Sequence, residues 1–510
     1  MTIRLNSIVG GVPVERRLFQ AAALFYPDYR FTLGAPGPLE VAQAIGNARS
    51  AEFPTLSERI QALQRAAQLF SFEREHLEHT TRLTGMPITE VERAYTDIPR
   101  LLRSVSQVLQ ARFHRLGKEN ESLLEVTVPG LYRMLAQPGG FCYAITPGLD
   151  PRAAAIAAGN LALLGIPFIL RASYKDCAAP LVLQALFEAG FDPRCAALLY
   201  LDRDSPDFQS THFKLVDSAS VLWTFGPREA IDPTLRYERT MRRAVVDLED
   251  SEPQTPEAVH TAIEKAQAAG KLRVEDVLQD HFAGKIVLRH ETGSSALIAS
   301  GPFDEHTCQV LQASTGYAVL CTAARSVFTD AGPQWIEAAV DFYTHLKTGD
   351  PLDPQTQAGC IHPRDLDHLQ GLLRKHALHM KTYGGERLSE FQMSPTVVVA
   401  KDADPQPAFG QTWLGTEIPT YVLALQPVES VEQAAAILNT YTQERPRLAV
   451  ALVNVPAEKR LPAIRALRAT TVLIDLPTTT LVPSFHEGND YALSLSQAKV
   501  IVDGTHPHHP

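Results

Sequence analysis

The chain has 510 residues, of which 45% are hydrophobic and 20% charged, and its formal net charge at pH 7 is −10. A chain of this length exceeds one hydrophobic core, so we expect more than one globular domain. The acidic surplus excludes the clustered basic surface of a nucleic-acid-binding protein, and no apolar run reaches the roughly 18 residues that a membrane helix needs. The N-terminus lacks a signal-peptide core, so we expect a cytoplasmic protein with neither nucleic acid nor membrane as partner.

Six cysteines are spread along the chain without a CxxC pair, at positions Cys142, Cys177, Cys195, Cys308, Cys321 and Cys360. This spacing predicts free thiols, most of them buried, rather than a disulfide framework or a zinc ribbon. The histidine pairs His76/His79 and His376/His379 have the i, i+3 spacing of one helix face. We interpret them as exposed helix residues because no third ligand lies nearby in the sequence, and we therefore predict no metal site.

The first 120 residues have mainly helical patterns. Thr55 and Glu58 form a capping box at a helix start, and apolar residues recur behind them at helical spacing. Helical periodicity continues through residues 87–113. The segment that follows, from about residue 123 to 140, predicts a β-hairpin or a pair of extended arms.

From residue 141 onward, short apolar runs alternate with helical segments. The predicted strands of a first unit are residues 141–145, 168–170, 196–201 and 221–225, with helices at 152–164 and 179–189. A helix from Pro256 to Gly270 follows a polar stretch. The predicted strands of a second unit are residues 285–290, 396–400, 421–425, 448–453 and 471–475, with a helix that begins after Ser430. Such alternation predicts parallel, doubly wound sheets in two domains separated near residue 285, with a cleft between them.

The segment that begins at Cys321 is the most informative one. It reads CTAARSVF and continues through a helical stretch to the sequence GDPLDP at residues 349–354 and then to Gly359. This order resembles the segment that follows the catalytic cysteine in the aldehyde dehydrogenase superfamily. Upstream, Glu291-Thr292-Gly293 resembles the motif that carries the general base of that family.

Further matches to this family occur in the same order along the chain. The sequence TGMP at residues 84–87 resembles an early TGKP motif, ITPGLDP at 145–151 resembles ITPWNFP, and LRAS at 170–173 resembles LKPS. The resemblance is collinear over roughly residues 50–500. It implies an α/β fold with a Rossmann-like cofactor-binding domain (1–122 and 141–285), an α/β catalytic domain (286–480), and a β-hairpin oligomerisation arm with a C-terminal tail (123–140 and 481–510).

The resemblance also implies a chemistry. The Cys321 thiolate would attack an aldehyde carbon, hydride would pass to NAD or NADP to leave a thioester, and Glu291 would activate water to release the acid. The residues implied to bind the cofactor are Thr146, Pro147, Arg171, Ser173, Tyr174, Gly226, Thr292, Gly293 and Glu417. The arms would pair between subunits, so we expect a homodimer or homotetramer.

The sequence departs from the family pattern at the position of the oxyanion donor. Leu149 aligns with the asparagine of ITPWNFP, and a leucine side chain cannot donate a hydrogen bond. Loss of one oxyanion donor typically lowers turnover by about 10²–10³-fold. Asp150 follows Leu149, and its carboxylate would repel a developing oxyanion.

Other departures fall around the cofactor. Tyr174 replaces an acidic residue, so selectivity for NAD is less expected, and Arg171 with Lys175 could meet a 2′-phosphate instead. Pro419 replaces a phenylalanine, and residues 223–226 change the turn beside the pyrophosphate.

Three functions remain open at the level of sequence. The first is an NAD(P)-dependent aldehyde dehydrogenase that uses Cys321 and Glu291. The second is an acyl-CoA (thioester) reductase of the same superfamily, which Glu291 opposes because a water-activating base would hydrolyse the thioester. The third is a catalytically impaired binding or assembly subunit, which Leu149 favours.

Overall fold

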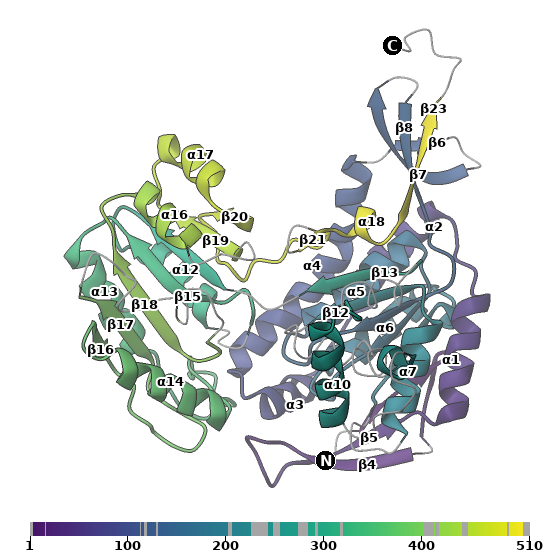
Figure 1. Cartoon of the computed structure of the whole chain (residues 1–510), viewed down its shortest axis with the longest axis horizontal. Helices are drawn as coiled ribbons and strands as arrows, with labels where there is room; N and C mark the ends of the chain where they lie inside the picture. Colours follow the sequence, from purple (N-terminus) through teal and green to yellow (C-terminus); the bar gives the residue numbers. More distant parts are fainter. Residues whose placement is uncertain are drawn as a thin grey trace.

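The structure is a computed structural model of the whole chain (Figure 1). It describes residues 4–15, 17–112, 114–116, 120–128, 131–201, 207–225, 243–247, 256–273, 284–290, 294–316, 320–401, 413, 418–440, 447–486 and 489–502. No helix in these ranges is long and apolar enough to cross a membrane. Figure 1 shows two α/β lobes side by side and a small sheet that projects beyond the first of them.

The first lobe is built on a seven-stranded sheet in the order β13-β12-β9-β10-β11-β2-β3. Its five parallel strands are β9 (Cys142–Ile145), β10 (Phe168–Arg171), β11 (Ala196–Leu199), β12 (Val221–Phe225) and β13 (Ile286–His290). The chain runs outward from β9 to β10 and β11 on one side, and then to β12 and β13 on the other. This is the strand order of a doubly wound nucleotide-binding sheet, with its switch point between β9 and β12. The four predicted strands of the first unit are therefore confirmed. The assignment of residues 285–290 to the second unit is wrong, because this strand is β13 and pairs in parallel with β12 at the edge of the first sheet.

Helices cover both faces of this sheet. Apolar side chains of α5 (Arg152–Leu164) and α6 (Ala178–Glu188) pack on one face of the sheet in one hydrophobic cluster. Those of α1 (Pro38–Ser50) and α7 (Phe208–Ser218) pack on the other face in a second cluster. The helices α2 (Leu56–Leu69), α3 (Arg74–Thr84) and α4 (Ile88–Arg112) add a further layer over α5 and α6. The predicted capping box is confirmed, since Glu58 N donates to Thr55 Oγ1 and Thr55 N donates to Glu58 Oε2.

The expectation of mainly helical structure is wrong for the first 35 residues. They form β1 (Arg4–Asn6), β2 (Ile8–Val9), β3 (Val12–Pro13), β4 (Arg17–Ala22) and β5 (Arg30–Ala35). β1, β5 and β4 make a small sheet, and β2 extends the large sheet by pairing Ile8 with Leu198 of β11. The physical reason is that β2 is defined by a partner far along the chain, which local periodicity does not reveal.

The second lobe contains a sheet in the order β16-β17-β18-β15-β14-β19-β20. Its strands are β14 (Ser295–Ala299), β15 (Ala324–Thr329), β16 (Met380–Tyr383), β17 (Thr396–Ala400), β18 (Val422–Pro427), β19 (Arg447–Val453) and β20 (Ala469–Ile474). All are parallel except the edge strand β16. Its helices include α12 (Glu305–Thr315), α13 (Pro333–Thr344), α14 (Pro363–His376), α16 (Val431–Thr440) and α17 (Ala457–Ala466). The predicted helix after Ser430 is confirmed, with Gln433 N donating to Ser430 Oγ.

A four-stranded antiparallel sheet projects from the first lobe and is called the arm here. It consists of β6 (His114–Leu116), β7 (Asn120–Val128), β8 (Leu131–Ala136) and β23 (Gln497–Val502), in the order β23-β8-β7-β6. The predicted hairpin is thus joined by the last described strand. Residues 478–484, called the crossing segment, lead from β20 of the second lobe back towards the first lobe and the arm.

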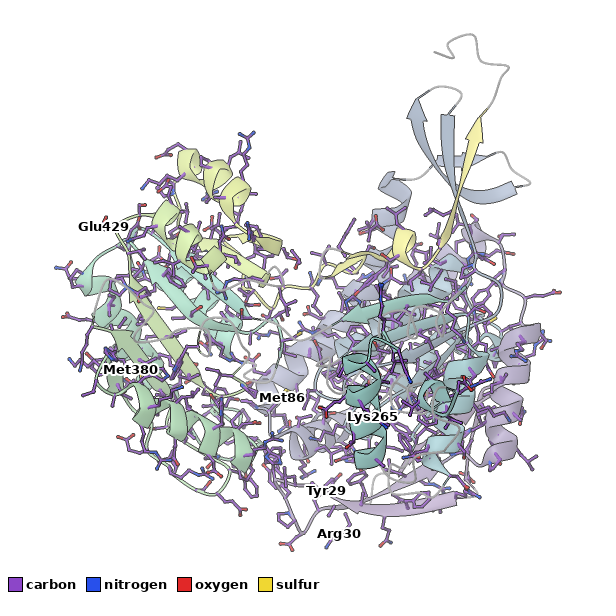
Figure 2. All side chains as sticks on the ribbon, viewed as in Figure 1. Tyr29, Arg30, Met86, Lys265, Met380 and Glu429 are labelled. Carbon is purple, nitrogen blue, oxygen red and sulfur yellow. The ribbon has the colours of Figure 1, made fainter. Side chains whose placement is uncertain are left out.

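Two sequence motifs interlock where the lobes meet. Cys360 N donates to Gly85 O at 2.7 Å, and Ile88 N donates to Pro351 O at 2.9 Å. A Cβ on Gly359 would lie 2.2 Å from Gly85 O, so only glycine fits this contact. Met86, in the same motif, lies between the two lobes in Figure 2. The TGMP and GDPLDP motifs are therefore packing elements between the lobes.

Candidate active site

Cys321 lies where the two lobes meet. It is half-buried, in a turn closed by the hydrogen bond from Ala323 N to Leu320 O, directly before β15. Leu320 and Ala323 pack into the hydrophobic cluster of the first lobe, whereas β15 belongs to the sheet of the second. The turn thus holds the thiol at the boundary between the doubly wound sheet of the first lobe and the second lobe.

A buried arginine holds the strand after this turn. Arg325 donates from Nε to Ile418 O at 2.6 Å and from Nη1 to Ala324 O at 3.1 Å. Ile418 follows Glu417, one of the predicted cofactor-binding residues. The Cys321 segment and the chain beside Glu417 are therefore tied together through Arg325.

The other five cysteines are poorly suited to nucleophilic chemistry. Burial raises the pKa of Cys142 and Cys177 well above the ordinary range, and raises that of Cys195 and Cys360 to about 12. Burial also raises the pKa of Cys308. Since the thiolate is the reactive form, burial disfavours reaction at each of these five thiols near neutral pH. The expectation that most cysteines are buried is wrong in part, since Cys308, Cys321 and Cys360 are only half-buried.

The carboxyl ends of β9, β10 and β12, called the cofactor edge here, bring together several predicted residues. Thr146 N donates to Arg171 O at 3.1 Å, which joins the loops after β9 and β10. A Cβ on Gly148 would lie 2.3 Å from Ser173 Oγ, so these two loops touch through a glycine. Pro147 lies between them and is half-buried. Gly148 was not among the predicted site residues.

Two buried hydroxyls at the cofactor edge have no hydrogen-bonding partner among the described residues: Thr146 Oγ1 and Thr224 Oγ1. Thr224 pairs in register with Ile145, the residue before Thr146, so the two threonines lie on neighbouring strands at the switch point. An unsatisfied buried hydroxyl costs about 1–3 kcal/mol. A polar ligand in the crevice at the switch point would offset that cost.

Arg171 and Tyr174 are engaged with aromatic rings. The Arg171 guanidinium lies 5.0 Å from the centre of the Phe208 ring and is buried, and Phe208 stacks on His212. Tyr174 is exposed and stacks on Phe31 of β5 at 5.7 Å. Thus Arg171 packs between the sheet and α7, while Tyr174 lies against the N-terminal strands.

The loop that carries Leu149 is fixed by an ion pair. Leu149 is half-buried, and the Asp150 carboxylate accepts hydrogen bonds from Arg152 Nε at 2.9 Å and Nη2 at 3.1 Å. Arg152 Nη1 also donates to Thr479 O in the crossing segment at 3.4 Å. The carboxylate beside Leu149 is therefore paired with Arg152, a partner that the sequence analysis did not identify. Sequence reasoning missed Arg152 because Thr479 lies in a distant part of the chain.

An aromatic cluster precedes the predicted base. His290 ends β13 and lies 4.7 Å from the Phe225 ring and 5.5 Å from the Tyr491 ring, and Tyr491 lies 4.6 Å from Trp223. Burial lowers the pKa of His290 to about 3, so this imidazole is neutral at pH 7. Tyr491 belongs to α18 (Tyr491–Ser494) and was not singled out from the sequence.

Five predicted site residues lie outside the described residues: Glu291, Thr292, Gly293, Gly226 and Glu417. The neighbouring residues His290, Ser294, Phe225 and Ile418 are described. Within the described part of the chain, no group of three or more His, Cys, Asp or Glu side chains could hold a metal ion.

The interpretation of the four histidines as exposed helix residues is wrong in part. His376 is half-buried, and His379 lies beyond the end of α14. His79 is fully buried rather than exposed, and its Nδ1 lies 2.6 Å from Tyr29 Oη. Phe31 packs edge-on against the same imidazole. The i, i+3 spacing placed His79 on a helix face correctly, but the strands that cover this face come from the mispredicted N-terminal segment.

Comparison with known proteins identifies the fold of the chain through solved structures. No family model and no curated protein matches the sequence. Solved structures match over nearly the whole chain. NAD-dependent aldehyde dehydrogenase from Sinorhizobium meliloti is 15% identical with a TM-score of 0.73, covering 100% of this chain and 96% of that one. Gamma-glutamyl-gamma-aminobutyraldehyde dehydrogenase from Burkholderia cenocepacia is 18% identical with a TM-score of 0.71, covering 98% and 97%.

A third similar structure is aldehyde dehydrogenase 21 from Physcomitrella patens in complex with the reaction product succinate, 14% identical with a TM-score of 0.71, covering 98% of each chain. The chain therefore has the aldehyde dehydrogenase fold along its whole length. The expected α/β fold class is confirmed.

Proposed function

We propose that the chain is an NAD(P)-dependent oxidoreductase that oxidises an aldehyde to a carboxylic acid through a thioester on Cys321. The observation that carries this proposal is the position of Cys321, half-buried at the boundary between a doubly wound nucleotide-binding sheet and a second α/β lobe. The domain boundaries expected from the sequence, and a homodimer or homotetramer joined through the arms, are part of the same proposal.

The cofactor edge fits a dinucleotide. Thr146 and Thr224 present buried hydroxyls without partners among the described residues, and Gly148 keeps the loop after β9 close to Ser173. Polar groups at the switch point of a doubly wound sheet are where such ligands bind. Two of the similar structures, from Pseudomonas syringae and Staphylococcus aureus, are complexes with NAD+. When bound, the nicotinamide would accept a hydride.

The side chains of this protein would supply the rest of the chemistry. The Cys321 thiolate would attack the aldehyde carbon and later carry the acyl group as a thioester. Glu291 would take a proton from the water that hydrolyses this thioester.

A second candidate function, a catalytically impaired binding or assembly subunit, is favoured by Leu149. The loop after β9 is present and well anchored, but it carries an apolar side chain where a hydrogen-bond donor is expected. An acyl-CoA reductase is a third candidate, which the retained Glu291 opposes. The proposed enzyme is therefore expected to turn over slowly.

One set of assays separates these functions. The purified protein is given an aldehyde panel with NAD or NADP, and acyl-CoA thioesters with the reduced cofactors, each beside the Cys321→Ala variant. Formation of reduced cofactor that depends on Cys321 supports the proposal. Oxidation of reduced cofactor with acyl-CoA alone supports the reductase. Absence of both turnover and cofactor binding by calorimetry leaves the binding subunit.

A further inference from the structure

The chain contains two Asp-Pro-Arg sequences in different surroundings, at residues 150–152 and 192–194. In each, the aspartate accepts a hydrogen bond from the arginine backbone N, at 3.0 Å for Arg152 and 2.8 Å for Arg194. In each, the two side chains also form an ion pair. The exposed fractions differ: 9% and 13% for the side chains of Arg152 and Asp150, but 54% and 28% for those of Arg194 and Asp192.

Arg152 is the buried cation of a site with several carboxylates. Besides Asp150 it faces Asp97 of α4, with Nη1 3.5 Å from Oδ2. Glu90, in the first turn of α4, also interacts electrostatically with Arg152. Glu90 forms an ion pair with Arg93 of the same helix. Asp176, in the loop after β10, interacts unfavourably with Asp150. Arg152 is therefore the buried cation of this site, and it is in direct contact with the carboxylates of Asp150 and Asp97.

The same residues contact the chain that leads to Cys321. Thr479, whose carbonyl accepts from Arg152, donates from Oγ1 to Ala313 O at 2.9 Å, and Thr478 N donates to Ser314 Oγ at 3.1 Å. These acceptors lie in the last turn of α12, just before the Cys321 segment. Glu90 lies against Gly316, where an added Cβ would be 3.3 Å from Oε1.

We propose that Arg152 is a positioning residue for Cys321, because it neutralises Asp150 and ties the Leu149 loop, through the crossing segment, to the end of the helix that precedes Cys321. This inference rests on the proposed function for the identity of the nucleophile. Without Arg152, the Asp150 carboxylate would stand uncompensated next to Leu149. Its field would disfavour both the Cys321 thiolate and the oxyanion formed on attack, since both are negative.

The test measures the rate of alkylation of Cys321 by iodoacetamide between pH 6 and 9, with peptide mass spectrometry to follow each cysteine separately. This reaction needs neither aldehyde nor cofactor. In Arg152→Met we expect the rate at pH 7 to fall about threefold or more, with the half-maximal rate reached at higher pH. In the double variant Asp150→Asn/Arg152→Met, which removes both charges, we expect the rate to return to within about twofold of wild type.

Two further variants guard against misfolding. Asp150→Asn alone leaves the Arg152 charge in place and is expected to speed alkylation, and Arg194→Met in the exposed motif is expected to leave it unchanged. An unchanged rate in both Arg152→Met and Asp150→Asn would overturn the proposal. So would a double variant as slow as Arg152→Met, because a purely structural role predicts no rescue. If the charge variants behave as expected but no Cys321-dependent turnover is found, the proposed function fails while Arg152 keeps its role.

Discussion

The cofactor edge and the turn around Cys321 differ in what they offer a ligand. The cofactor edge holds buried hydroxyls of Thr146 and Thr224 without partners among the described residues, so these hydroxyls can form hydrogen bonds with a ligand. Leu149, at the position where the family pattern has a hydrogen-bond donor, is apolar, and the Asp150 carboxylate that follows it is already paired with Arg152. The difference indicates that cofactor binding and turnover are separable in this chain. We expect ordinary affinity for a dinucleotide together with slow chemistry.

The largest expected effect follows removal of the thiol. Cys321→Ala should lower aldehyde-dependent formation of reduced cofactor by at least about a thousandfold, because no other thiol or base replaces the nucleophile. Calorimetry should show cofactor affinity within about twofold of wild type. Cys308→Ala, at another half-buried cysteine, is the control and should retain activity. Equal losses in turnover and cofactor binding would contradict the view that the two regions carry separate functions.

Restoring a donor beside the nucleophile should have the next largest effect. Leu149→Asn is expected to raise turnover by about a hundredfold, since one oxyanion donor typically contributes this much. Cofactor affinity should not change, because the substitution leaves the residues of the cofactor edge as they are. The initial rate of reduced-cofactor formation at saturating cofactor measures the effect. A Leu149→Asn variant no faster than wild type would show that slow turnover has another origin.

A buried histidine lowers the stability of the fold at acidic pH, so the two regions are best compared near neutral pH. Burial lowers the pKa of His79 from 6.5 to about 4. The unfolded chain therefore takes up a proton below about pH 6.5 that the folded state resists until about pH 4, so stability falls as pH decreases through this window. The full effect is about 3 kcal/mol. Denaturant unfolding at pH 7 and pH 4.5 measures it, and His79→Phe should reduce the dependence without removing it, because buried His290 contributes in the same direction.

An exposed helix residue provides the reference for that experiment. His368 lies on the exposed face of α14, and His368→Phe should leave the pH dependence of unfolding as it is in wild type. If His79→Phe retains the full wild-type slope between pH 6.5 and 4, the buried imidazole is not its source.

The smallest expected effect concerns the two hydroxyls at the cofactor edge. Thr146→Val and Thr224→Val should each weaken cofactor binding by about tenfold or less, because one neutral hydrogen bond is lost. Without cofactor, the same variants should be as stable as wild type or more stable, since an unsatisfied buried hydroxyl is removed. Thr81→Val, at another buried hydroxyl without a partner among the described residues, should change stability alone. If cofactor affinity is unchanged in both Thr146→Val and Thr224→Val, the cofactor does not bind at the cofactor edge.

The sequence predicted the parts of the fold that local patterns encode. Most strands of the two large sheets and the helices after Thr55 and Ser430 follow from runs of apolar residues and capping residues, and these are confirmed. The strands β14, β15 and β16 were not predicted, and β13 was predicted in the second unit although it pairs with β12 in the first. The N-terminal strands were missed because β2 depends on pairing Ile8 with Leu198. The burial of His79 was missed for the same reason, since Phe31 of β5 and Tyr29 just before it cover this imidazole.

The site was predictable only in part. The segment around Cys321 and the loops with Thr146 and Ser173 could be placed from ordered motifs. Arg152 could not, because its role depends on a contact with Thr479 across the interface of the lobes. The roles of the predicted residues, Glu291 among them, stay predictions.

The central claim is that Cys321 carries the acyl group during aldehyde oxidation. Acid quenching during turnover, followed by peptide mass spectrometry, tests it directly. The account predicts an acyl adduct on the peptide containing Cys321 only when both aldehyde and oxidised cofactor are present, accumulating further in Glu291→Gln because hydrolysis is slowed. Reduced cofactor formed without this adduct, or an adduct on Cys308 or Cys360 instead, would contradict it.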